Sequence, residues 1–151
     1  MRKTGRKTDA EKLLNTIRVD QRPTQSDFDL AKKALPYAVK MGLSKEVEQE
    51  IFLRVSPELA MLGRLQMPFM DTIVNYCRLV ARIRINTEIL DDVGATYQVG
   101  ELIKPHPLLT QLNTDTRVLR HLTNDLGLSP ASTSTVSSDL QNGKSDDFDG
   151  F

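Results

Sequence analysis

The strongest constraint on the fold lies in the second half of the sequence, where the hydrophobic period changes twice. From Pro68 to about Asp92, apolar side chains recur every three or four residues, which predicts one long helix. Gly94 follows and can adopt the left-handed backbone that ends a helix. Residues 96–104 then read as two short strands around Gly100, which predicts a small β-hairpin whose turn is not the standard two-residue type.

A second long helix should follow the hairpin. Pro107 is suited to the first turn of a helix, and a leucine stripe continues to Leu126. A helix, a short hairpin and a second helix bring the two helices together as an antiparallel pair. The predicted fold is therefore mainly α, with a helical N-terminal region at residues 9–55 and a helical oligomerisation core at residues 56–130.

Capping residues and prolines divide the N-terminal half into shorter helices. Leu13, Leu14 and Ile17 predict a first short helix, and Ser26 is the expected cap of a second. Pro36 lies inside that second helix and should kink or split it.

The next two helices are expected to be separate. Ser44 is the predicted cap of a helix that continues to Arg54, with Glu46, Glu48 and Glu50 on its outer side. Ser56-Pro57 then has the capping hydroxyl and first-turn proline of a new, short helix.

The pattern Ala38-x-x-x-Gly42 invites comparison with a helix-turn-helix motif. However, Glu48 stands where an apolar contact is usual, and Pro36 falls inside the first helix. Phosphates would also repel the acidic second helix. The pattern therefore favours an ordinary helical hairpin over a DNA-reading helix.

Charge is distributed unevenly along a chain of zero net charge. Residues 1–40 hold ten Lys/Arg against five Asp/Glu, whereas residues 131–151 hold one Lys against four Asp. We expect a disordered basic arm at residues 1–8 and a disordered acidic tail at residues 131–151. A basic head suits a polyanion such as DNA, although charge alone is equally compatible with two solvated ends. The predicted phosphate-contacting residues are Arg2, Lys3, Arg6, Lys7, Arg18, Arg22, Lys32, Lys33 and Lys40.

The apolar content is low for a self-sufficient monomer, with 39% hydrophobic residues and no Trp, so subunit contacts should supply part of the burial. Arg78 and Arg82 share one face of the long helix and could line a channel. Pairing with acids of a neighbouring subunit is the favoured interpretation. The predicted oligomerisation residues are Tyr76, Arg78, Leu79, Val80, Arg82, Ile83, Leu108, Leu112 and Leu119.

The end of the acidic tail alternates acids with aromatic residues. Asp147, Phe148, Asp149 and Phe151 resemble a short linear motif that docks on a basic, apolar groove. The alternative is an inert solvated tail, for which two phenylalanines have little use.

No catalytic motif accompanies these features. The sequence lacks a Walker loop, a GxGxxG fingerprint, a nucleophile elbow and an HExxH pair. Cys77 is the only cysteine and should be a small buried hydrophobe, while His106 and His121 are too isolated to form a metal site. No apolar run could span a membrane. We expect a soluble intracellular protein that is not an enzyme and that needs no cofactor or metal.

An ordered series of motifs runs through the second half of the chain, from Ser56 to Ser132. Its elements are Pro57-Glu58-Leu59, Leu62-Gly63-x-Leu65, Tyr76-Cys77, Lys104-Pro105-His106-Pro107 and the terminal Leu126-Gly127-Leu128-Ser129-Pro130-Ala131-Ser132. The series resembles that of phage terminase small subunits. Two departures are the absence of an Arg shortly after Pro130 and the presence of Met67-Pro68 where a Thr-containing cap is common.

This resemblance implies a homo-oligomeric ring of roughly eight or more subunits. It implies that the ring recognises the packaging start on viral double-stranded DNA and regulates a large terminase subunit in the host cell cytoplasm. The acidic tail at residues 131–151 is then the segment expected to dock on the large subunit. Two rival interpretations remain open. One is a dimeric helical transcription regulator, and the other is a structural adaptor that binds no nucleic acid.

Overall fold

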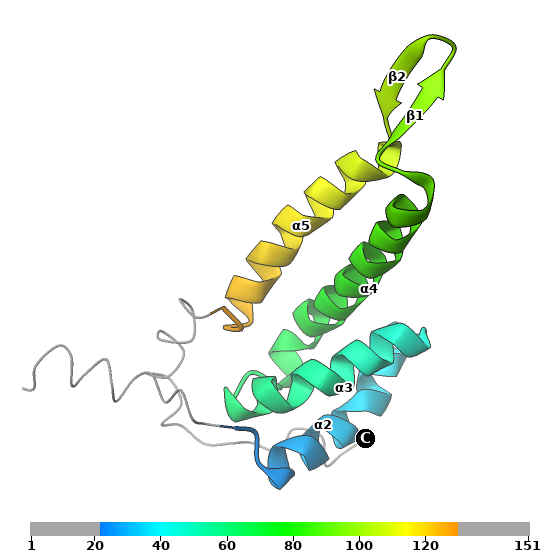
Figure 1. Ribbon diagram of the computed structural model, residues 1–151. Coiled ribbons are helices and arrows are strands. Elements are labelled where there is room, and N and C mark those ends of the chain that lie inside the picture. The colour runs from blue at the N-terminus through cyan, green and yellow to red at the C-terminus, as the bar shows by residue number, and fades with distance from the viewer. Residues whose placement is uncertain (1–21, 130–151) are drawn as a thin grey trace, which may run out of the picture.

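The computed structural model describes residues 22–129, and these are mainly helical (Figure 1). In chain order the elements are α2 (Gln25–Lys40), α3 (Glu46–Met61), the short 3-10 helix η1 (Met67–Phe69), α4 (Met70–Val93), β1 (Thr96–Val99), β2 (Leu102–Pro105) and α5 (Pro107–Asp125). The helix–hairpin–helix arrangement predicted from the period changes is confirmed. The short helix expected near Leu13, the basic arm and the acidic tail lie outside the described residues.

The hydrophobic core joins α2, α3 and the first half of α4. Three alanines of α2, namely Ala31, Ala34 and Ala38, are buried and allow α3 to approach closely. The fully buried Phe52 of α3 and Met70 of α4 fill the space between the helices. Leu126, just after α5, belongs to the same cluster and anchors the end of that helix.

α2 begins two residues earlier than predicted. Thr24 is its N-cap, and Asp27 closes the cap because its Oδ2 accepts hydrogen bonds from the Thr24 backbone N–H (2.8 Å) and hydroxyl (2.7 Å). The prediction that Ser26 caps the helix is therefore wrong. Pro36 does not split the helix either. Its ring lies on the exposed side, where water can hydrate the carbonyl oxygen that loses its donor.

α3 is one continuous helix rather than two. It begins after Lys45, not Ser44, and passes through Ser56-Pro57 without a break. A proline inside a helix costs about 3 kcal/mol. Here Ser56, Pro57 and Leu59 are buried together, so burial of this turn in the core offsets that cost. The predicted helix start at Ser56 is wrong.

The prediction that Glu48 lies on the solvated side of α3 is also wrong. Its side chain is only 5% exposed rather than solvated, and its Oε2 accepts a hydrogen bond from the Lys45 backbone N–H at 3.3 Å. The carboxylate thus caps the start of α3 from inside the fold. The exposed acids of this helix are Glu46, Glu50 and Glu58.

The hairpin turn is simpler than predicted. Val99 pairs with Leu102 in the antiparallel register, which leaves a two-residue turn of Gly100 and Glu101. Gly100 has φ +64°, and no described residue other than glycine has a positive φ. This is the pattern of a type II′ turn, which matches the twist of the flanking strands. The expectation of a non-standard turn is wrong, whereas Gly94 does end α4 with φ +86°, as predicted.

The second half of α4, the hairpin and α5 extend beyond the core, and we call residues 82–125 the arm. α4 and α5 lie side by side and antiparallel, with the hairpin at the far end (Figure 1). All eight strand residues are exposed, and Asp115 is the only buried residue within α5. Among residues 22–129, the arm is therefore a two-helix layer without a third element to cover it.

Cys77 offers a test of the core. Burial, and to a lesser extent the nearby Glu48 carboxylate, raises the pKa of its thiol to about 12. Because the thiolate is the reactive form, a thiol reagent at pH 8 should label the native protein about a thousandfold more slowly than the protein in denaturant. Native labelling at the rate of a free cysteine would contradict this packing.

Candidate assembly and nucleic-acid surfaces

One ion pair joins the two helices of the arm. The guanidinium of Arg82 on α4 donates from Nε to Asp115 Oδ2 (2.8 Å) and from Nη2 to Oδ1 (2.6 Å). Gln111, one turn earlier on α5, donates to the same Oδ1 at 2.7 Å. The Asp115 side chain is 2% exposed and that of Arg82 is 55% exposed. The buried carboxylate is therefore bound on both oxygens and fixes α5 against α4.

These contacts also set the ionisation of Asp115. Burial alone would raise its pKa, but the hydrogen bonds from Arg82 and Gln111 and the positive charge of Arg82 lower it by more. The net effect is a pKa below the ordinary range, so Asp115 carries its charge at neutral pH.

The two arginines predicted to pair with a neighbouring subunit have different surroundings. Arg82 has a carboxylate partner within its own chain, Asp115, and its side chain is still 55% exposed. Arg78 is exposed, and its Nη1 lies 3.9 Å from the position that a Cβ on Gly42 would occupy. It therefore extends toward the turn between α2 and α3. Contact of either arginine with another subunit stays a prediction.

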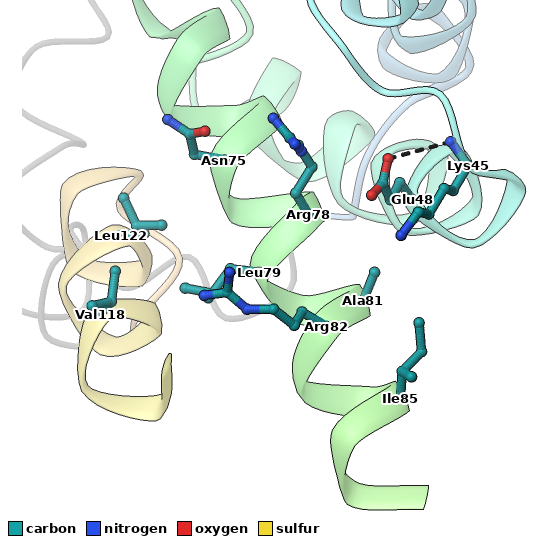
Figure 2. Close-up of a pocket in the computed structure, with 10 residues that line it drawn as sticks. All are labelled: Lys45, Glu48, Asn75, Arg78, Leu79, Ala81, Arg82, Ile85, Val118 and Leu122. Carbon is teal, nitrogen blue, oxygen red and sulfur yellow. Dashed lines mark hydrogen bonds between the residues drawn. The ribbon is translucent and has the colours of Figure 1, made fainter. Parts of the chain in front are cut away.

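An open groove of about 610 Å³ lies beside these arginines (Figure 2). α4 forms its floor, with α5 on one side and the start of α3 on the other (Figure 2). The lining residues are Lys45, Glu48, Asn75, Arg78, Leu79, Ala81, Arg82, Ile85, Val118 and Leu122. The groove thus combines cationic and apolar side chains.

Three of the seven apolar residues predicted to form the subunit interface already pack inside the chain. Leu79 is buried, and Tyr76 and Val80 pack against the core. Partly buried positions are occupied by Ile83, Leu108, Leu112 and Leu119. These partly exposed faces remain candidates for contact between subunits.

The residues predicted to form the subunit interface do not include the most exposed apolar side chains of the arm. Leu102 and Ile103 of the hairpin are 65% and 75% exposed, although they are adjacent in one strand and point to opposite faces. Ile85, Ile89 and Val93 continue the exposed apolar surface along α4. The sequence signal was present, because two consecutive large apolar residues in a short hairpin indicate that both faces become covered.

The junction between hairpin and α5 depends on His106. Its Nδ1 accepts a hydrogen bond from the Leu108 N–H (3.2 Å), and its own backbone N–H donates to the carbonyl oxygen of Ala95 (2.8 Å). Its ring also makes an edge contact with Tyr97. His106 therefore caps α5 and ties it to the base of the hairpin, a role that the Lys104–Pro107 motif did not reveal.

Four of the predicted phosphate-contacting residues can be placed. Arg22, Lys32, Lys33 and Lys40 are exposed on α2 or just before it. The sixteen residues of α2 span about 24 Å, so its lysines form an elongated surface rather than a compact site. Outside the described residues lie Arg2, Lys3, Arg6, Lys7 and Arg18, as well as Asp147, Phe148, Asp149 and Phe151 of the tail.

Within residues 22–129, no group of three or more His, Cys, Asp or Glu side chains could hold a metal ion. In the same part of the chain, no helix combines the length and apolarity needed to cross a membrane.

Substitutions in the arm ion pair should have unequal effects on stability. Arg82→Met leaves a buried carboxylate with Gln111 as its remaining side-chain donor, whereas Asp115→Asn leaves an arginine that water can reach. We expect a loss of about 1–3 kcal/mol for Arg82→Met and about 1 kcal/mol for Asp115→Asn, measured by urea unfolding at pH 7. Equal losses, or a larger loss for Asp115→Asn, would contradict the geometry.

The acid dependence of stability follows from the lowered pKa of Asp115. Its contribution is fully present above the unfolded-state pKa of about 4 and is lost as the pH falls from there through the lower folded-state pKa. Asp115→Asn should therefore flatten the fall in unfolding free energy below about pH 4. An unchanged pH profile in this variant would refute the assignment.

Comparison with protein families identifies the second half of the chain. The family model described as phage terminase, small subunit, matches residues 49–142, which is more than half of the 151 residues. No curated protein and no solved structure gives a match. The matched region includes most of α3, all of α4, the hairpin and α5, and thus the whole arm and the groove except its side at Lys45 and Glu48. The chain therefore belongs to the phage terminase small-subunit family, whose members act in phage DNA packaging in the infected cell.

Proposed function

We propose that this protein recognises the packaging start on viral double-stranded DNA and brings that DNA to the large terminase subunit. In this proposal it has no catalytic activity of its own and regulates the ATPase and nuclease of the large subunit. Membership of the family supports the proposal. The observation that carries it within the structure is the uncovered apolar surface of the arm.

Assembly is the first part of the proposal. A two-stranded hairpin is marginally stable in water unless something packs on it. Here both faces of the hairpin carry exposed apolar residues, and the exposed stripe Ile85–Ile89–Val93 continues from it along α4. A second copy can cover this surface with the same kind of residues. If this contact is repeated around a closed ring of roughly eight or more subunits, every arm is covered by a neighbouring subunit.

DNA contact is the second part, and we assign it to α2 and the basic residues before it. Each lysine contact with a phosphate is weak, but a ring repeats the surface once per subunit. Several weak contacts on one oligomer then give tight, salt-sensitive binding. A disc-like oligomer with α2 toward the duplex would need no base-reading helix in each subunit.

The rival transcription regulator would need such a reading helix, and α3 is its candidate. The exposed side of α3 carries Glu46, Glu50 and Glu58 against Arg54. Phosphates would repel that face, and Glu48 is buried as a helix cap rather than available for contact. The charge of α3 therefore disfavours this rival.

The assembly proposal predicts that the double variant Leu102→Asp, Ile103→Asp dissociates the oligomer. Each added carboxylate would have to be buried without a partner in the interface. Native mass spectrometry should give a ring for the parent and for the control Leu53→Asp, which alters an exposed apolar residue outside the arm. The double variant should give monomers with an unchanged helix content. A dimeric parent would contradict the ring.

The DNA proposal predicts that Lys32→Glu combined with Lys40→Glu weakens duplex binding at every sequence tested. The slope of log K against log salt should become less negative by about two or more, because at least two phosphate contacts are lost. Arg54→Glu, together with Arg120→Glu, makes the same charge change at exposed positions away from α2 and outside the hairpin, and serves as control. Equal weakening in the two double variants would refute a specific role for α2.

A further inference from the structure

The groove beside α4 has a lining that selects for a particular chemistry. Lys45, Arg78 and Arg82 are the cations, and Glu48 is the one acid among the lining residues. The Glu48 carboxylate is already engaged by the Lys45 backbone N–H. Arg82 uses Nε and Nη2 on Asp115, but its side chain is 55% exposed, and a guanidinium has five N–H donors. The groove therefore offers positive charge to an anionic occupant.

Apolar side chains distinguish this groove from a phosphate-binding surface. Val118 is 45% exposed and Ile85 is 39% exposed, and Leu122 completes the apolar part. These apolar side chains would not contribute to binding a DNA backbone, because proteins contact phosphates through cations and hydrogen-bond donors. An occupant that carries both carboxylates and aromatic rings could pair with the cations of the lining and pack on its apolar side chains.

The end of the chain itself has that composition. Its last six residues are Asp146-Asp147-Phe148-Asp149-Gly150-Phe151, with three carboxylates and two phenylalanines. The volume of about 610 Å³ is large enough for phenyl rings with their flanking backbone.

Chain length places the segment within reach of the groove. Residues 130–145 separate Ser129 from Asp146, and a chain of that length can span up to about 55 Å. Val118 and Leu122 line the groove from the last two turns of α5, so the groove lies close to the point where the tail begins. Attachment to the same chain also raises the effective concentration of the segment at the groove.

We propose that the groove between α3, α4 and α5 binds the acidic aromatic end of this chain, residues 146–151. The carboxylates pair with Arg78, Arg82 and Lys45, one phenylalanine ring packs on Val118 and Leu122, and the other packs on Ile85 across α4 (Figure 2). A tail held in this way is withheld from the large subunit, so the groove and the large subunit compete for one segment. The groove binding itself does not depend on the proposed role in DNA recognition.

The absence of Trp from the chain provides a clean probe. Phe148→Trp introduces a single indole into the full-length protein. A docked indole should emit at shorter wavelength than the same residue in denaturant, and acrylamide should quench it several-fold less efficiently. Adding Arg78→Glu or Val118→Asp should move the emission to longer wavelength and restore quenching. Both sites are exposed, and circular dichroism checks that each variant keeps its helix content.

A charge exchange and a matched control complete the test. Asp147→Lys combined with Arg78→Glu should restore the shielded emission, whereas Arg120→Glu, on α5 but outside the groove, should leave it unchanged. Solvent-like emission in the parent Phe148→Trp protein would overturn the proposal. So would shielded emission that the groove variants do not alter. A change of oligomeric state or of DNA affinity in Arg78→Glu without any change at the indole would assign the groove to a second copy or to DNA instead.

Discussion

The position of the arm depends on one buried carboxylate. α5 contributes no fully buried apolar residue within its bounds, and Asp115 is the residue it buries against α4. Arg82 binds both carboxylate oxygens in a bidentate contact, and Gln111 shares one of them. Such a contact specifies register and orientation strongly because its geometry is planar and directional. It adds less to stability than an apolar core of similar size, because the desolvation of the charges opposes the attraction.

This division explains why the subunit consists of two unequal parts. The core of α2, α3 and the first half of α4 closes around small alanines and Phe52 and contains most of the buried apolar residues. The arm is aligned by polar contacts at Asp115 and His106 and leaves its apolar side chains exposed. Polar contacts inside the arm set its shape, and in the proposed ring apolar contacts with another copy complete it. Assembly and ordering of the hairpin would then be one coupled event.

Local signals in the sequence predicted the elements well where local chemistry decides them. The long helix, its end at Gly94, the hairpin and the start of the last helix at Pro107 all depend on hydrophobic period, glycine and proline. Two failed predictions, the Ser26 cap and the non-standard hairpin turn, misread local signals, because the Thr24–Asp27 cap and the Gly100 turn are themselves local. Others failed because tertiary packing overrides a local signal. Ser56-Pro57 has every feature of a helix start, yet burial in the core carries α3 through it.

Predictions about the candidate surfaces were limited by tertiary packing in the same way. Exposure of Lys32 and Lys40 could be predicted from their spacing, but the partner of Arg82 could not, because Asp115 is 33 positions away in the sequence. Glu48 was assigned to the solvated face although it is buried as a cap, since the sequence does not show which helix will cover it. The groove likewise forms where three helices meet, so no single segment of the sequence predicts it.

In the proposed ring, the arm becomes complete only when another copy covers it. Hydrogen–deuterium exchange of the backbone amides of residues 96–104 tests this directly, with the protein held above and below the concentration at which it assembles. We expect slow exchange in the assembled protein and fast exchange in the dissociated subunit, while the amides of α3 stay protected in both. Equal protection of the hairpin in both states, or fast exchange in the assembled protein, would contradict it.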